Sequence, residues 1–74
     1  SSDEIDKDDP MMREIIEETR DKLRKIPLKY WIEYESWYAI GAALHATHSS
    51  MLHDWIEFSK QASNFQVGKC EEKW

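Results

Sequence analysis

The sequence predicts an all-α protein, a small bundle of three helices followed by a short fourth helix at the C-terminal end. Only two glycines and two prolines interrupt the 74 residues, and residues with high helix propensity dominate the rest. Apolar residues recur at steps of three and four along separate stretches, which is the period of one helix face. A chain this short has room for one hydrophobic core, so we expect a single domain over residues 10–74.

The first helix is expected from residue 10, after an acidic lead-in. Residues 1–9 carry five acids, one lysine and almost no apolar side chains, which is typical of a disordered segment. Asp9 suits the N-cap and Pro10 the first helical position. Pro27 should end the helix, because a proline disfavours helical geometry in the residue before it. The predicted buried stripe consists of Met12, Ile15, Ile16, Thr19, Leu23 and Ile26.

The second helix is expected over about residues 33–47, after a connection formed by residues 27–33. A glycine inside a helix costs about 1 kcal/mol relative to alanine. Gly41 therefore indicates that another helix crosses closely at that position. The predicted buried stripe consists of Tyr34, Trp37, Ile40, Gly41 and Leu44.

The third helix is expected over about residues 51–61, with Ser49 or Ser50 as its N-cap. Residues 62–66 should form a loop that returns an aromatic side chain, Phe65, to the core. The predicted apolar positions of this helix are Leu52, Trp55, Ile56, Phe58 and Ser59.

The last helical stretch is expected from about Val67 to Trp74. Cys70 and Trp74 are four residues apart, so they share one face of a helix and should both be buried. Cys70 is the only cysteine, which rules out an intrachain disulfide and indicates an intracellular protein. No apolar run approaches the roughly 20 residues of a membrane span, so we expect no membrane partner.

Independent catalysis is not expected, because no residue pattern matches a known chemistry. The histidines and Asp54 match no zinc signature, such as two histidines four apart with a glutamate between them. No third group is placed to orient a base beside Cys70. We therefore predict no catalytic residue, no metal site and no cofactor for this domain itself. The candidate metal ligands in this pattern are His45, His48 and His53.

The charge pattern points to one candidate contact surface. A net charge of −5 argues against attraction of nucleic acid by the whole surface. Residues 10–29 nevertheless carry six bases against four acids, and two aromatic residues follow them. Such a run can hold a phosphate backbone while an exposed ring stacks on a base. The predicted contacts are Arg24, Lys25, Lys29, Tyr30 and Trp31, with Lys60, Lys69 and Lys73 behind them.

A structural reading of the same residues stays open. Trp31 can pack under the connection, and the basic side chains can form solvated helix faces. Ion pairs four residues apart, Glu18 with Lys22 and Asp21 with Lys25, would then neutralise part of the charge.

Residues 34–74 contain an ordered series of aromatic, glycine and cysteine positions: Tyr34-x-x-Trp37, Ile40-Gly41-x-Ala43-Leu44-His45, Trp55-x-x-Phe58-Ser59, Phe65 and Cys70-x-x-x-Trp74. This series resembles the primase C-terminal helical domain of the PriCT-2 type, which accompanies primase-polymerases and primase-helicases of phages, plasmids and large DNA viruses. Ile32-Glu33, Phe58 and Phe65 depart from the residues that family members commonly have there, but the changes at Phe58 and Phe65 preserve shape.

The resemblance implies a non-catalytic accessory domain of a longer replication protein. The domain would help to hold single-stranded DNA template, the initiating nucleotide or both beside a separate catalytic primase domain, with a helicase domain in the same chain. The alternative is a protein–protein or architectural module that links primase and helicase domains without touching nucleic acid. Nucleotide with magnesium would serve the full-length protein, at the site of DNA replication in the cytoplasm of a prokaryotic host or a virus-infected cell.

Overall fold

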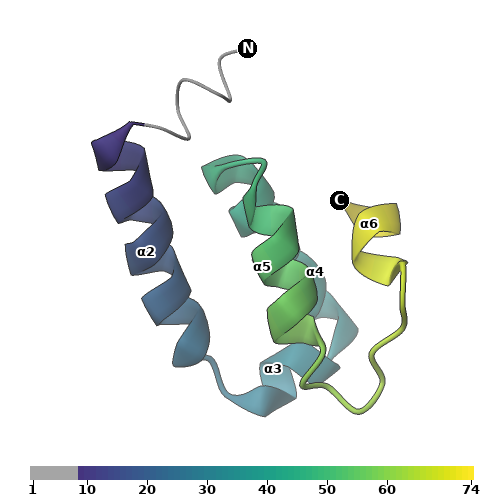
Figure 1. Ribbon diagram of the computed structural model, residues 1–74. Helices are drawn as coiled ribbons and strands as arrows, with labels where there is room; N and C mark the ends of the chain where they lie inside the picture. The colour runs from purple at the N-terminus through teal and green to yellow at the C-terminus, as the bar shows by residue number, and fades with distance from the viewer. Residues whose placement is uncertain (1–8) are drawn as a thin grey trace.

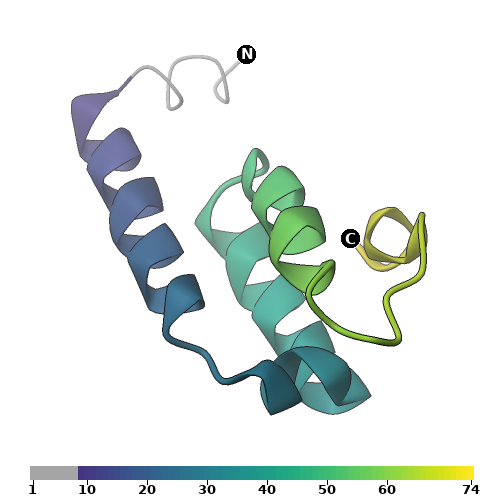
Figure 2. The ribbon, with the colours of Figure 1, turned by 60° about the horizontal axis from the view of Figure 1, so that its bottom comes forward.

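The computed structural model describes residues 9–74, which form five α-helices and no strand. α4 (Tyr34–Thr47) and α5 (Met51–Ser59) run antiparallel at the centre, as Figure 1 shows. α2 (Pro10–Arg24) lies along one side of this pair and α6 (Lys69–Lys73) along the other (Figure 2). α3 (Leu28–Ile32) closes the end where α2 leads into α4. The predicted all-α class is confirmed. Residues 1–8 of the predicted lead-in lie outside the described residues.

α2 begins as the sequence predicts. The Asp9 carboxylate accepts the backbone N–H of Met11 at 3.0 Å, and Pro10 occupies the first turn. The side chain thus satisfies one of the N–H groups that a helix start leaves without an intrahelical partner. The helix ends at Arg24, and the N–H of Lys25 caps it by donating to carbonyls of the last turn.

The buried stripe of α2 is narrower than predicted. Ile16 and Leu23 are buried, whereas Ile15 is 39% exposed. The prediction was wrong for Ile15 because, among the described helices, α2 packs mainly against α5, and that contact is small, so neighbours cover one narrow face. Met12, Thr19 and Ile26 are half-buried at the edges of that face.

α3 lies within residues 27–33, which were expected to form the connection. α2 already ends at Arg24, before Pro27, and Pro27 is the N-cap of the next helix, with φ at −60°. A proline suits such a position because it has no N–H to lose and its φ is already near helical values. The five-residue helix buries Trp31, whose ring stacks on Phe58 of α5 with centroids 5.6 Å apart.

The crossing of α4 and α5 confirms the prediction for Gly41. A Cβ atom built on Gly41 would lie 2.5 Å from Cε2 and Cη2 of Trp55, so only a glycine lets the ring approach the helix backbone. Trp55 is fully buried and stacks on Trp37 at a centroid distance of 4.5 Å. Nε1 of Trp31 and Nε1 of Trp55 are buried, and neither has a hydrogen-bond partner within residues 9–74.

Tyr34 lies outside the core, against the prediction. Its side chain is 54% exposed, whereas Trp37 and Leu44 of the same stripe are buried and Ile40 is half-buried. Tyr34 is the first residue of α4. The ring of Phe58, near the C-terminal end of α5, is already covered by Trp31 of α3. The ring of Tyr34 therefore remains at the surface, beside Trp37.

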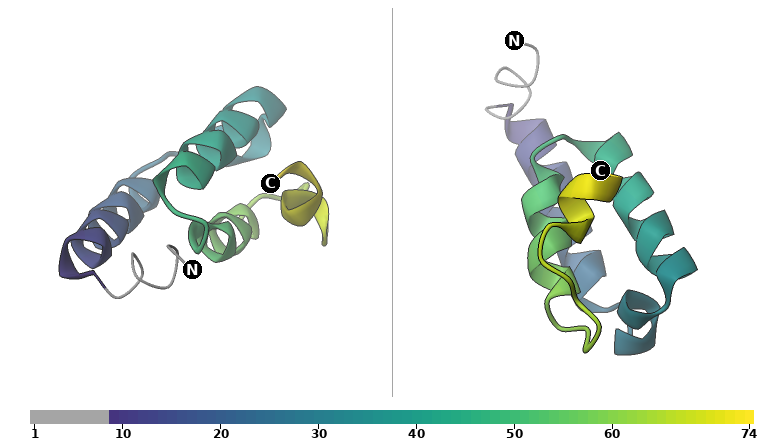
Figure 3. Two further views of the ribbon diagram at one scale, coloured as in Figure 1. Left: turned by 90° about the horizontal axis from the view of Figure 1, so that it is seen from above. Right: turned by 90° about the vertical axis from the view of Figure 1, so that its right-hand side faces the viewer.

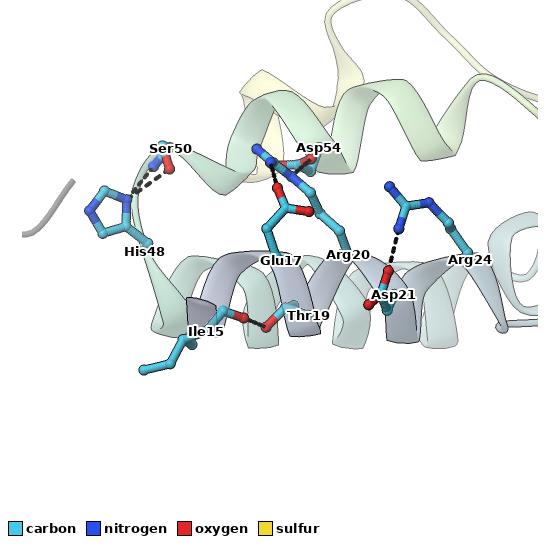
Figure 4. Close-up of polar contacts among 9 residues, drawn as sticks. All are labelled: Ile15, Glu17, Thr19, Arg20, Asp21, Arg24, His48, Ser50 and Asp54. Carbon is cyan, nitrogen blue, oxygen red and sulfur yellow. Dashed lines mark hydrogen bonds and ion pairs between the residues drawn. The ribbon is translucent and has the colours of Figure 1, made fainter. Parts of the chain in front are cut away.

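The turn between α4 and α5 uses a histidine as the cap. Nδ1 of His48 accepts the backbone N–H of Ser50 at 3.1 Å, while Ser50 itself makes no side-chain capping bond. Figure 4 shows this contact beside α2. Ser50 occupies the N-cap position, one of the two predicted, but its backbone is already helical, and a capping side chain needs an extended backbone.

The C-terminal segment packs against the far side of α5. Phe65 is half-buried, and the Asn64 side-chain amide donates to the Ile32 carbonyl at 3.0 Å, which ties the loop to α3. α6 is shorter than predicted, because it begins only at Lys69. Val67 lies before the helix and is 94% exposed. Cys70 is buried as predicted and Trp74 is half-buried. None of the helices within residues 9–74 has the length and apolar character needed to cross a bilayer.

Candidate nucleic-acid interface

Residues 22–30, which we call the basic segment, join the C-terminal end of α2 to α3. Lys22 and Lys25 are exposed and three residues apart, so they share one face of α2. No carboxylate among residues 9–74 pairs with either ammonium group, and the same holds for Lys29. The predicted pairs Glu18–Lys22 and Asp21–Lys25 are not formed. Three cations therefore stand uncompensated along nine residues of chain.

Tyr30 supplies the aromatic part of the basic segment. Its side chain is 40% exposed, and Nζ of Lys29 lies 5.1 Å from the centre of its ring. This is a cation–π contact, which holds the ring at the surface next to a positive charge. An exposed ring beside a cation can stack on a base while the cation meets a phosphate.

Trp31 does not belong to this surface. It is 2% exposed and packs against Phe58, so its ring does not lie at the surface beside Tyr30. The structural reading of Trp31, packing under the connection, is the one that the structure supports. Trp31 instead anchors α3 to α5 and holds Tyr30 in place.

The arginines of α2 are paired with acids. Arg24 pairs with Asp21 one turn earlier, so it is less available than its lysine neighbours. Nε of Arg20 donates to the Asp54 carboxylate of α5 at 2.8 Å, and its Nη1 meets Glu17 (Figure 4). The hydrogen bond to Asp54 is the main cause that raises the pKa of Arg20. The Asp54 side chain is only 10% exposed, so this pair fastens α2 to α5.

The three C-terminal lysines lie elsewhere. Lys60 at the end of α5 hydrogen-bonds Glu57 at 2.7 Å, and that bond lowers the pKa of Glu57. Lys69 and Lys73 project from α6 on the far side of α5 from α2, as Figure 3 shows for the helices. The fold therefore does not gather all predicted contacts on one surface.

Two pockets border α4 and α6. The first pocket, of about 210 Å³, lies at the start of both helices, and aromatic rings form its walls. The second pocket, of about 200 Å³, lies one turn further along and ends at Trp74. Sequence reasoning missed both, because their walls come from segments 30 to 40 residues apart in the chain. The residues used below are Tyr34, Trp37, Asn64, Phe65 and Lys69 in the first pocket, and Tyr38, His45, Lys73 and Trp74 in the second.

The histidines and Cys70 are occupied by packing contacts. His45 meets the Trp74 ring edge-on at 4.8 Å, and His48 caps α5. Within residues 9–74, no group of three or more histidine, cysteine or acidic side chains is arranged to hold a metal ion. Burial raises the pKa of the Cys70 thiol, which is 1% exposed and donates to Oγ of Ser59. A thiol in this state is protonated and a poor nucleophile at neutral pH.

Comparison with known proteins gives one match. The family model described as Primase C terminal 2 (PriCT-2) matches residues 19–74, from the middle of α2 to the last residue. This stretch contains the Arg20–Asp54 pair, the basic segment and both pockets. No curated protein and no solved structure matches the chain. Because the family model covers well over half of the chain, the chain belongs to the primase C-terminal 2 family.

Proposed function

We propose that this chain is a non-catalytic accessory domain of a DNA primase that holds single-stranded template beside a separate catalytic domain. The observation that carries the proposal is the row of three lysines in the basic segment, Lys22, Lys25 and Lys29, which have no carboxylate partner among the described residues. Membership of the primase C-terminal 2 family supplies the replication context. Such a domain acts by positioning, because a template held near the catalytic site meets the initiating nucleotide more often.

The charge distribution fits local contact with a strand. The whole chain carries −5, so a strand is repelled by most of the surface and attracted at the basic segment. The half-exposed Tyr30 ring offers a stacking surface next to Lys29. Arg24 and Lys60 are bound to acids, so we place them at the margin of the contact.

The test is binding of a fluorescein-labelled oligothymidylate to the chain, followed by fluorescence anisotropy over a range of salt concentrations. Each phosphate contact on a single strand contributes a slope of about −0.7 to the log–log salt plot. Replacing Lys22, Lys25 and Lys29 by alanine should therefore flatten the slope by about 2. Lys60→Ala is the single-site comparison for Lys25→Ala, since both remove one positive charge, and it should weaken binding less. Equal losses from the two single variants, or no binding at low salt, would refute the proposal.

The wider setting is also part of the proposal. In the full-length protein, the catalytic domain would bind the nucleotide with magnesium, and a helicase domain would follow in the same chain. The protein would then work where DNA is replicated, in a prokaryotic cytoplasm or a virus-infected cell.

A second candidate function is an architectural link between the catalytic and helicase domains without contact to nucleic acid. Met11 and Ile15 favour it, because they are 69% and 39% exposed and share one face of α2. Under this function, Met11→Asp with Ile15→Asp would reduce primer synthesis by the full-length protein. Oligothymidylate would show no affinity for the domain at any salt concentration.

A further inference from the structure

The two pockets between α4 and α6 repeat one pair of residues. Tyr34 of α4 and Lys69 of α6 line the first pocket, and Tyr38 and Lys73 line the second. Each pair is displaced by four residues along its own helix, so the second pair stands one helical turn beyond the first on both sides. A ligand made of two similar units in sequence fits such a repeat.

The two tyrosines are about half exposed and lie next to each other. Tyr34 and Tyr38 are 54% and 46% exposed, and their ring centroids lie 6.0 Å apart with a tilt of 31°. Within residues 9–74, neither hydroxyl group has a hydrogen-bond partner. Large rings left this exposed on neighbouring turns offer stacking surface for flat aromatic groups.

The lysines present charge next to those rings. Nζ of Lys69 and Nζ of Lys73 lie 3.8 and 3.9 Å from the carboxylate of Glu72, which they share. Both distances exceed a hydrogen bond, so the donors of each ammonium group remain available for phosphate oxygens. Glu72 competes with a phosphate for both lysines.

Each pocket has a polar side chain in its lining. In the first pocket, Nδ2 of Asn64 donates to the Ile32 carbonyl, so its Oδ1 is left to accept a hydrogen bond. In the second, His45 lies beside Trp74. Volumes of about 210 and 200 Å³ suit one base each, and a folded protein segment would need a larger surface.

We propose that these two pockets bind two consecutive nucleotides of a single strand, with a base against Tyr34 and the next against Tyr38, and with phosphates at Lys69 and Lys73. The inference rests on the proposed function and adds where the bases go. The first pocket is also lined by Trp31 of α3, directly after Tyr30. The basic segment and the first pocket thus share α3, and a strand that contacts both would pass along this helix.

The experiment uses the whole chain and a labelled oligothymidylate of about eight nucleotides, within the usual site size of single-strand binders. Loss of base stacking costs about 1–3 kcal/mol per base, so Tyr34→Ala and Tyr38→Ala should each weaken binding by about 5-fold to 150-fold. Tyr34→Phe and Tyr38→Phe keep the ring and should bind like the wild type. Thermal melting verifies that each variant is folded.

Glu72→Gln should change the affinity for the oligothymidylate in the opposite direction. It releases both lysines from their carboxylate and should strengthen binding by about 2-fold to 5-fold, the range of an exposed ion pair. Glu71→Gln is the matched control, because it changes the net charge equally but makes no ion pair with either lysine. Equal effects of the two glutamine variants would contradict the role of Lys69 and Lys73.

The remaining outcomes separate this inference from the proposed function. If both Tyr→Ala variants bind like the wild type while the triple lysine variant of the basic segment loses affinity, the strand does not enter the pockets and the template-holding function stands. If the wild type binds no oligothymidylate at low salt, both fail. The dinucleotide pTpT should displace the labelled strand at lower concentration than thymidine 5′-monophosphate, and equal potency would exclude a two-nucleotide site.

Discussion

Replacing Gly41 by alanine should destabilise the protein, although the same change stabilises most helices. In an open helix the gain is about 1 kcal/mol, from the higher propensity of alanine. At Gly41, however, the new Cβ would lie 2.5 Å from two atoms of the Trp55 ring, where ordinary contacts begin at 3.4 Å. The ring has little room to withdraw, because it is fully buried and stacks on Trp37 at 4.5 Å.

The size of the effect follows from two opposing contributions. Overpacking of a core costs about 1–3 kcal/mol, and a rigid, fully buried ring places this site near the upper end. Subtracting the propensity gain of about 1 kcal/mol leaves a net loss of about 2 kcal/mol. For a chain of this length, such a loss lowers the melting temperature by about 8–16 °C. Thermal melting by circular dichroism and urea unfolding both measure it.

Two further variants make the test specific. Ala43→Gly, at an exposed position of the same helix, should cost about 1 kcal/mol and so calibrates the propensity contribution. Trp55→Phe shortens the ring system, and in that background Gly41→Ala should cost less, which a double-mutant cycle reports as coupling. A Gly41→Ala protein as stable as the wild type would show that the crossing of α4 and α5 has room for a side chain. Gly41→Leu should abolish folding before it affects binding.

Three other perturbations have defined outcomes. Arg20→Ala leaves the nearly buried Asp54 carboxylate without its cation and should lower the free energy of unfolding by about 1–3 kcal/mol, a range reduced because Arg20 is one-third exposed. Urea unfolding measures the loss, and the double variant Arg20→Ala with Asp54→Leu should recover part of it. His48→Ala removes the acceptor of the Ser50 N–H and should lower stability by about 1 kcal/mol in thermal melts, whereas His48→Asn, which can accept the same bond, should lose less. The raised pKa of the Cys70 thiol favours the protonated form in the folded state. Its contribution to stability is therefore complete below the unfolded pKa of about 8.5 and is lost as pH rises through the folded pKa. Unfolding free energies above that pH should fall less steeply for Cys70→Ala, and identical slopes would contradict the assignment.

The elements that could be predicted from the sequence are those whose causes are local. The start of α2 depends on Asp9 and Pro10 alone, and both take their expected positions. The close crossing at Gly41 was predicted because a glycine inside a helix needs a reason, and Trp55 is that reason. Both predictions rest on one or two neighbouring residues, so no knowledge of the tertiary fold was needed.

The errors come from contacts between distant segments. α3 is too short for a period of 3.6 to be visible, and Trp31 is buried by Phe58, which is 27 positions further along. Periodicity assigned Tyr34 to the core because the stripe was extended without knowing that α3 occupies that end of α5. Asp54 was considered as a possible metal neighbour, yet it is buried by a cation from α2. Two features of the candidate site also could not be predicted without the fold. These are the absence of carboxylate partners for the lysines among the described residues, and the two pockets.

The arrangement of the tryptophans makes the protein its own optical probe. Trp37, Trp55 and Trp74 form a row with centroid distances of 4.5 and 5.8 Å, so light absorbed by one indole can pass to the next. The row ends at Trp74, which borders the second pocket and touches His45. Emission from that end should change when an aromatic ligand arrives. Folding and occupancy of the pocket can thus be followed by intrinsic fluorescence, with no label attached.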